Sequence, residues 1–437
     1  MIKNVLKNRL LVQQQGGNTM LAITEFGHYG KEGDWTDAFK QAIEHLDSRG
    51  GGTLYVPAGS YSTHSIQLGS NMTLYLDAGA VLNFTDDVEN YEVISMEFEG
   101  IAGSMYKPLI YASGEKNVAV VGHGKLNGNG QRWWRESKQF PHKRPYLVCF
   151  DNCQHVLLEG VTLENSPVWT VHPIYCDDVI IRGVKIKNPA DSPNTDGIDP
   201  DSSRNVRISD CIIDVGDDCI AIKAGTEDTP RKMPCENITI TNCNMLHGHG
   251  GVVIGSEMSG GIRNVTITNC VFQETDRGIR LKTRRKRGNA MENMVFDNIV
   301  MDKVMCPFVF NMYYYCGAGG KEKHVWDKAA YPLDETTPAI RNIMISNCMV
   351  TSATAAAGFF YGLAEQPIEN VMLSNVSVCM AQDGAPDMPA MMSQLEPVQG
   401  EGFFLRNAKN ITFSNVRITG QKGEMTDVDQ TVELTIR

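Results

Sequence analysis

The chain has 437 residues, and its 40 basic and 51 acidic residues give a formal net charge of −11 at neutral pH. This acidic excess argues against nucleic acid as the main partner. No run of about 18 or more apolar residues occurs, so we expect no membrane-spanning helix.

The first segment, residues 1–20, is predicted to be an extension that precedes the fold. Its apolar run Leu10-Leu11-Val12 is far shorter than the ~7–15 residues of a signal-peptide core. Glutamines and glycines at 13–17 then interrupt it, and Met20 is an alternative start. We therefore expect a cytoplasmic protein.

An amphipathic helix is predicted between Asp34 and Ser48. Apolar residues recur there at three-to-four spacing, Asp34 is suited to the N-cap, and glycines 50–52 follow the end of the helix. Strand-like residues 53–59 come next. The segment of about 21–52 is therefore expected to form a short helical cap on the fold that follows.

A phrase of alternating apolar and polar residues recurs along the rest of the chain. Clear copies begin at Asn205 and Asn237, and copies between Asp178 and Asn293 are 27, 32, 27 and 29 residues apart. Such a period is typical of a solenoid, because one strand cannot bury its apolar face until copies stack. The predicted fold is all-β, a single-stranded right-handed parallel β-helix that forms one domain over 21–437.

Asparagines and cysteines recur within the phrase. Asparagine at a turn tolerates left-handed backbone and can stack as an amide ladder, so we interpret these residues as structural. Cysteines fall inside the predicted strands, at Cys211, Cys243, Cys270 and Cys348. We expect stacked free thiols in the core, which is consistent with a reducing compartment.

Two stretches interrupt the period, at about 128–146 and 305–338. The first contains Trp133 and Trp134, and the second contains three consecutive tyrosines at 313–315. Insertions of this kind become surface loops on one face of a solenoid, often the binding face.

Four polar motifs fall in four successive repeats. They are Asn194-Thr195-Asp196-Gly197, Gly216-Asp217-Asp218-Cys219, His247-Gly248-His249-Gly250 and Gly278-Ile279-Arg280-Leu281-Lys282. Asp217, His249 and Asp276 each lie twelve residues after the asparagine that opens their repeat. Because stacked coils are ~4.8 Å apart, the four motifs are predicted to line one groove.

The residue types of this groove indicate cleavage of an acidic sugar polymer. Glycoside hydrolysis needs a proton donor on the leaving oxygen and a base or nucleophile on the opposite face. Asp196, Asp217 and Asp218 cannot all ionise cheaply when close together, so one is expected to keep its proton. Arg280 and Lys282 can bind the carboxylate of an acidic sugar.

With these four motifs in order, the chain resembles the polygalacturonases of glycoside hydrolase family 28. The resemblance implies hydrolysis of α-1,4-galacturonosyl bonds with inversion, on an acidic polysaccharide or oligogalacturonide substrate. It implies no cofactor and no metal. Residues Ser166 to Pro173 further resemble bacterial exo-acting members.

The resemblance also implies roles for individual residues. Asp217 corresponds to the general acid, Asp196 and Asp218 to the pair that activates water, and His249 to the histidine that supports the acid. Substrate-binding roles are expected for Arg280, Lys282, Asn194, Tyr315 (with Tyr313 as the alternative), Lys223 and His172. An inverting mechanism predicts ~6.5–9.5 Å between Asp217 and the water-activating pair, whereas ~5 Å is typical of retention.

The mode of action and the reaction class leave several alternatives open. The two insert loops and the cap can close one end of the groove, which favours exo release of galacturonic acid over endo cleavage. A rhamnogalacturonan or a substituted galacturonan is an alternative substrate. A calcium-dependent pectate lyase and a non-catalytic glycan-binding β-helix are alternatives from other classes.

Overall fold

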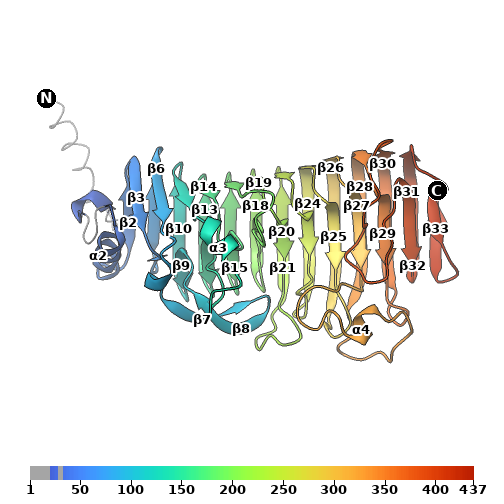
Figure 1. Cartoon of the computed structure of the whole chain (residues 1–437), viewed down its shortest axis with the longest axis horizontal. Coiled ribbons are helices and arrows are strands. Elements are labelled where there is room, and N and C mark those ends of the chain that lie inside the picture. The colour runs from blue at the N-terminus through green and yellow to red at the C-terminus, as the bar shows by residue number, and fades with distance from the viewer. Residues whose placement is uncertain (1–19, 28–32) are drawn as a thin grey trace.

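The structure, a computed structural model, describes residues 20–27 and 33–437. They form a right-handed parallel β-helix in which each turn of the chain adds strands to the same sheets, with the first described coils (blue) and the last coils (red) at opposite ends (Figure 1). The predicted fold class is confirmed. The predicted extension, residues 1–20, lies outside the described residues except for Met20.

The longest sheet begins as two parallel series of short strands. The first series is β1 (Met20–Ala22), β2 (Gly52–Val56), β5 (Met72–Leu76), β10 (Lys116–Gly122), β13 (Gln154–Glu159), β16 (Asp177–Arg182), β18 (Arg204–Ser209) and β21 (Cys235–Thr241). The second series is β3 (Gly59–Thr63), β6 (Ala80–Phe84), β11 (Lys125–Asn127), β14 (Thr162–Glu164), β17 (Lys185–Lys187), β19 (Ile212–Asp214) and β22 (Asn244–Leu246).

The two series merge where β24 pairs with both β21 and β22. From there each coil contributes a single long strand. These strands are β24 (Ile262–Gln273), β26 (Ala290–Asp302), β28 (Ala339–Ala353), β30 (Ile368–Met380) and β32 (Ala408–Thr419), followed by β34 (Val432–Ile436).

Another face of the helix carries the predicted polar motifs. Its N-terminal part contains β4 (Ile66–Gln67), β9 (Ile110–Ser113), β12 (Val148–Asp151) and β15 (Val171–Ile174). Its C-terminal part contains β20 (Asp218–Ile222), β23 (Gly250–Ile254), β25 (Arg277–Lys282), β27 (Cys306–Asn311), β29 (Ala356–Tyr361), β31 (Glu401–Arg406) and β33 (Thr426–Val428). Parallel bridges through Ile198 and Asp201 link the two parts.

Every second side chain of the strand phrase is buried, as its alternation of apolar and polar residues predicts. In β21, Ile238 and Ile240 are buried while Asn237 and Thr239 are exposed. Each buried aliphatic side chain lies beside its equivalent in the next coil, because Ile238 pairs with Val265 in strand register. The core is therefore one continuous apolar column along the helix axis.

The recurrent asparagines form the expected ladder at a turn. The Nδ2 of Asn237 donates to Oδ1 of Asn205 at 3.2 Å, and Asn264 donates to Asn237 at the same distance. All three have positive φ. Cys211, Cys243, Cys270 and Cys348 are buried free thiols, also as expected.

A helix covers the N-terminal end of the β-helix, where α2 (Thr36–Asp47) packs on β2 and β4 through Ala38, Phe39, Ala42 and Leu46. The N-cap residue is Trp35 and not Asp34 as predicted, but Oδ1 of Asp34 accepts a hydrogen bond from the Thr36 amide at 2.9 Å. A short η1 (Ile23–Glu25) precedes it. Among the described residues, no helix is long and apolar enough to cross a membrane.

Several excursions leave the coils at one edge, the lower edge in Figure 1. They include the antiparallel hairpin β7 (Val93–Phe98) and β8 (Ile101–Tyr106), preceded by η2 (Val88–Asn90). The interruption at 128–146 contains α3 (Gln131–Arg135). The interruption at 305–338 begins with strand β27 and then contains α4 (Lys323–Trp326).

Candidate active site

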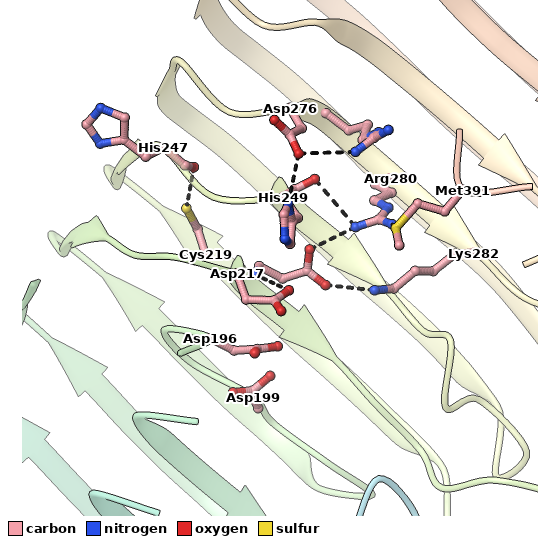
Figure 2. A network of polar contacts seen from close by, with 12 residues as sticks. Asp196, Asp199, Asp217, Cys219, His247, His249, Asp276, Arg280, Lys282 and Met391 are labelled. Atoms are coloured by element: carbon pink, nitrogen blue, oxygen red, sulfur yellow. Dashed lines mark hydrogen bonds and ion pairs between the residues drawn. The ribbon is translucent and has the colours of Figure 1, made fainter. Parts of the chain in front are cut away.

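The four motifs lie side by side because their strands are in register. Ile198 pairs with Ile220, which pairs with Val252, which pairs with Ile279. Asp196 therefore lies beside Asp218 on the next coil. The repeat count predicted this alignment, and Figure 2 shows the resulting cluster of side chains.

Three carboxylates form the centre of the cluster. One oxygen from each of Asp196, Asp217 and Asp218 lies within 4.8 Å of the other two. Asp196 and Asp218 are buried, while Asp217 is half-buried and accessible from the groove. A sugar in the groove can therefore reach Asp217 directly.

Asp218 is held as a carboxylate by two cations. Its Oδ1 accepts from Nη1 of Arg280 at 3.0 Å and its Oδ2 accepts from Nζ of Lys282 at 2.7 Å. Burial raises the pKa of Asp218, but Lys282 and Arg280 outweigh it and hold this pKa well below the usual range. Gly250 packs closely beside this ion pair, since a Cβ there would lie 2.4 Å from Cγ2 of Val253 and 3.3 Å from Oδ1 of Asp218.

Asp196 and Asp217 are less well compensated. Burial raises the pKa of Asp196 well above its usual value, and the charges of Asp217 and Asp199 add to this effect. Burial and the charge of Asp218 raise the pKa of Asp217. The cluster is therefore arranged to keep a proton beside an ionised carboxylate, which acid–base chemistry at a glycosidic bond requires.

His249 faces the cluster and has a partner that the sequence did not assign. Its Nδ1 lies 2.8 Å from Oδ2 of Asp276, and this hydrogen bond raises the pKa of His249 even though burial lowers it. Asp276 lies twelve residues after Asn264, in register with His249, and this spacing could have identified it as the partner of His249.

Gly248 adopts φ +78°, where a Cβ would lie 2.1 Å from the Asp217 carbonyl oxygen.

The cluster opens into a cavity of ≈ 230 Å³. The catalytic motifs line one part of it, and Arg284, Arg287 and residues 316–318 line another. Met391 also lines the cavity, although it belongs to none of the sequence motifs.

The tyrosine at the cavity is Tyr314, which corrects the prediction of Tyr315 or Tyr313. The Tyr314 ring lies 5.0 Å from Nζ of Lys282 and lines the cavity, whereas Tyr315 does not line it. Tyr313 is fully buried in the core. The chain leaves strand β27 at Asn311, so the three consecutive tyrosines no longer follow the strand alternation that sequence reasoning relies on.

The remaining predicted binding residues occupy different depths. Asn194 lines the cavity, and its Oδ1 accepts from Nη2 of Arg144 at 2.8 Å. Lys223 is almost wholly buried at the floor of the cavity. His172 was predicted to bind substrate, but it is 1% exposed and packs between Tyr146 and Trp169. His172 therefore has no surface to offer a sugar, and that prediction is wrong.

The carboxylates of the cluster lie close together because Asp196 and Asp218 are on adjacent coils. One oxygen from each of Asp196, Asp217 and Asp218 lies within 4.8 Å of the other two, whereas the ~6.5–9.5 Å of an inverting enzyme is a separation between whole carboxyl groups. The separation expected between Asp217 and the water-activating pair therefore stays a prediction. A cation could fit among three such oxygens, but Arg280 and Lys282 already engage both oxygens of Asp218.

Comparison with known proteins agrees with the site. Residues 53–391 match the family model described as glycosyl hydrolases family 28. A protein of Vitis vinifera named "Probable polygalacturonase" is 32% identical over 376 residues, which are 82% of this chain and 74% of that protein.

Two solved structures are similar over almost the whole chain. A hyperthermoactive exopolygalacturonase from Thermotoga maritima has a TM-score of 0.75 at 30% identity, covering 94% of this chain and 96% of that one. A family 28 exopolygalacturonase of Yersinia enterocolitica has the same TM-score at 20% identity, covering 95% and 77%, and this supports the fold alone. The chain is a glycoside hydrolase and belongs to family 28.

Proposed function

We propose that this enzyme hydrolyses α-1,4-galacturonosyl bonds and releases galacturonic acid from the end of polygalacturonate or oligogalacturonides. The observation that carries this proposal is the cluster of Asp196, Asp217 and Asp218 beside Arg280 and Lys282 in one cavity. The carboxylates supply an acid and a base, and the cations favour an anionic sugar. The Vitis and Thermotoga relatives, named as polygalacturonases, support the same substrate.

Exo action is supported by a wall at the N-terminal side of the cavity. Glu99 and Ile101, at the tip of hairpin β7–β8, line the cavity. The carbonyl oxygen of Gly100 between them accepts from Oγ1 of Thr229 at 2.6 Å and from Oγ1 of Thr226 at 3.2 Å. The tip is thus tied to the loop after β20, so the groove is bounded on this side, as exo action on a chain end would require.

In the proposed reaction, Asp217 donates its proton to the glycosidic oxygen as the bond to the sugar C1 breaks. Its accessibility from the groove and its raised pKa suit this role. A water molecule attacks C1 from the opposite face and loses its proton to the pair of Asp196 and Asp218, of which Asp218 is held ionised by Arg280 and Lys282.

Inversion is proposed because Asp218 is a poor nucleophile. Both of its oxygens are engaged by cations, which lowers their reactivity toward C1 and leaves water as the attacking group. A retaining enzyme would instead use a free carboxylate as the nucleophile. The anomeric form of the first product is therefore the decisive measurement.

A time course on defined oligogalacturonides tests the proposal. We expect monomer as the sole early small product, with its anomeric configuration opposite to that of the cleaved bond by NMR. Mixed oligomers at early times would show endo action. Rising ultraviolet absorbance that a chelator abolishes would show a lyase, and binding without turnover would show a glycan-binding protein.

A preference for rhamnogalacturonan is tested in the same format. Arg280 and Lys282 argue for a uronate beside the cleaved bond but do not define the sugar beyond it. Faster cleavage of rhamnogalacturonan than of oligogalacturonides would overturn the substrate assignment.

A further inference from the structure

Lys223 lies directly after β20 on the floor of the cavity, and only 4% of its side chain is exposed. Its Nζ is 3.4 Å from Oε2 of Glu257, 3.5 Å from Oδ1 of Asp199 and 3.7 Å from Oδ2 of Asp196. The ring of Trp169 covers it, with 4.3 Å from Nζ to the ring centroid. This ammonium group is therefore fixed in place rather than free to follow a substrate.

The reaction requires the proton to be on one particular carboxyl group of the cluster. Asp218 is ionised because two cations hold it, so Asp196 and Asp217 are left to share the remaining proton. Hydrolysis needs that proton on Asp217, which is accessible from the groove. Asp196 is the more deeply buried of the two, and its Oδ1 has no hydrogen-bond partner, so burial alone would place the proton on Asp196.

We propose that Lys223 is a positioning residue that favours the charged form of Asp196, so that the shared proton is available to Asp217 as the acid. The fixed cation approaches Asp196 from the floor of the cavity, on Oδ2. An opposite charge at this distance favours the charged form of a carboxyl group. The inference deepens the proposed function and rests on it.

The other charges around Asp196 do not replace Lys223. Asp199, Asp217 and Asp218 face it and disfavour its ionisation. Arg144 is the other cation that interacts with it, but its guanidinium binds the carbonyl oxygens of Pro167 and Pro193 and the amide of Asn194.

The charges around Lys223 hold it protonated. Burial lowers the pKa of Lys223, but Glu257 and the nearby aspartates, Asp199 first, raise it well above its ordinary value. Glu99 and Asp201 also interact with Lys223, although burial raises the pKa of both carboxyl groups, that of Asp201 to about 7. His172 is neutral, because burial lowers its pKa to about 3.

The first test follows the carboxyl groups themselves and needs no substrate. The intact protein is labelled with ¹³C at the aspartate carboxyl carbons and titrated by NMR, and Asp196→Asn identifies its resonance by loss. In Lys223→Met we expect the midpoint of Asp196 to move up by about one to three pH units. In Lys223→Arg, which keeps the charge, the midpoint should stay near that of the wild type.

The second test is the pH profile of turnover. Because the base must be ionised, we expect the acidic limb of kcat to move to higher pH in Lys223→Met, with kcat at the optimum lower by about 10². Glu257→Gln should move the limb the other way, since it removes a competing partner of Lys223 and a negative charge. A purely structural role would not shift the two variants in opposite directions.

An unchanged Asp196 midpoint in a folded Lys223→Met protein would overturn the inference, as would a change in KM alone. If Lys223→Met does not fold, Glu257→Gln tests the inference in its place. An unchanged titration midpoint of Asp196 in Glu257→Gln would also overturn it. Failure of the wild type to release galacturonate would instead overturn the proposed function, and the NMR titration would still decide the role of Lys223.

Discussion

Nζ of Lys282 lies 2.7 Å from Oδ2 of Asp218, although strands β25 and β20 are separated by the intervening strand β23. Both side chains are at least nine-tenths buried. The pair, with Arg280, holds the carboxylate in its ionised form at the centre of the active site.

Replacing Lys282 by Met should destabilise the fold, because it leaves Asp218 with a single cation in a buried place. Breaking a buried ion pair from one side costs about 3–5 kcal/mol, which denaturant unfolding can measure. Removal of Lys303, whose exposed ion pair with Glu274 has similar geometry, is the control and should change little.

The same variant should alter the acid dependence of stability. The folded pKa of Asp218 is depressed, so its ion pairs stabilise the protein above the unfolded pKa, and this contribution is lost as pH falls through the folded value. The unfolding free energy of Lys282→Met should therefore fall less steeply with acid than that of the wild type. Equal slopes would contradict the assignment.

Asp217→Asn should abolish turnover while binding of oligogalacturonide is largely kept. The amide cannot donate a proton at the required point, so kcat should fall by at least about 10²–10⁴. Initial rates measure the first effect and calorimetric titration the second. Near-normal turnover would remove Asp217 from the acid role.

Asp276→Asn should narrow the pH range of activity from the alkaline side. The hydrogen bond from Asp276 raises the pKa of His249, so the histidine stays protonated to higher pH in the wild type. Without it, His249 loses its proton earlier and the alkaline limb of kcat/KM should move to lower pH. Asp214→Asn, which removes a similar partner from His247 outside the cavity, should leave the profile unchanged.

His172→Phe should flatten the dependence of stability on pH between about 6.5 and 3. Burial lowers the pKa of His172 to about 3, so the unfolded chain binds a proton in this range while the folded protein does not. Stability from this residue is present above the unfolded pKa and is lost as pH falls, by on the order of 4 kcal/mol. Thermal unfolding at several pH values would show a slope unchanged from the wild type if His172 were solvated.

Shortening hairpin β7–β8 should convert exo action to endo action. Its tip at Gly100 is tied to Thr226 and Thr229, and the adjoining Glu99 and Ile101 line the cavity. Replacement of the tip by a short glycine linker should yield mixed oligogalacturonides at early times in chromatographic analysis. Thr229→Val, which removes only one tie, should give a smaller shift, and monomer alone from the shortened enzyme would contradict the role of the wall.

The register of the coils, and with it the composition of the active site, could be derived from the amino-acid sequence. Parallel coils stack with equivalent residues side by side, so counting twelve residues from each asparagine was enough to bring Asp217, His249 and Asp276 together. Alternation along each strand determined which aliphatic side chains enter the core. These are local properties that recur in every coil, so they can be recognised in the sequence without a structure.

The positions of side chains in segments that interrupt the repeat could be seen only in the folded protein. Tyr314 rather than Tyr315 faces the cavity because the chain leaves strand β27 before it, and hairpin β7–β8 reaches the site from more than a hundred residues away. The depth of Lys223 and His172 likewise depends on Trp169, which packs over Lys223 from an earlier coil and against His172 within its own coil. Contacts between non-repeating segments depend on packing across the whole solenoid, and neither period nor spacing encodes them.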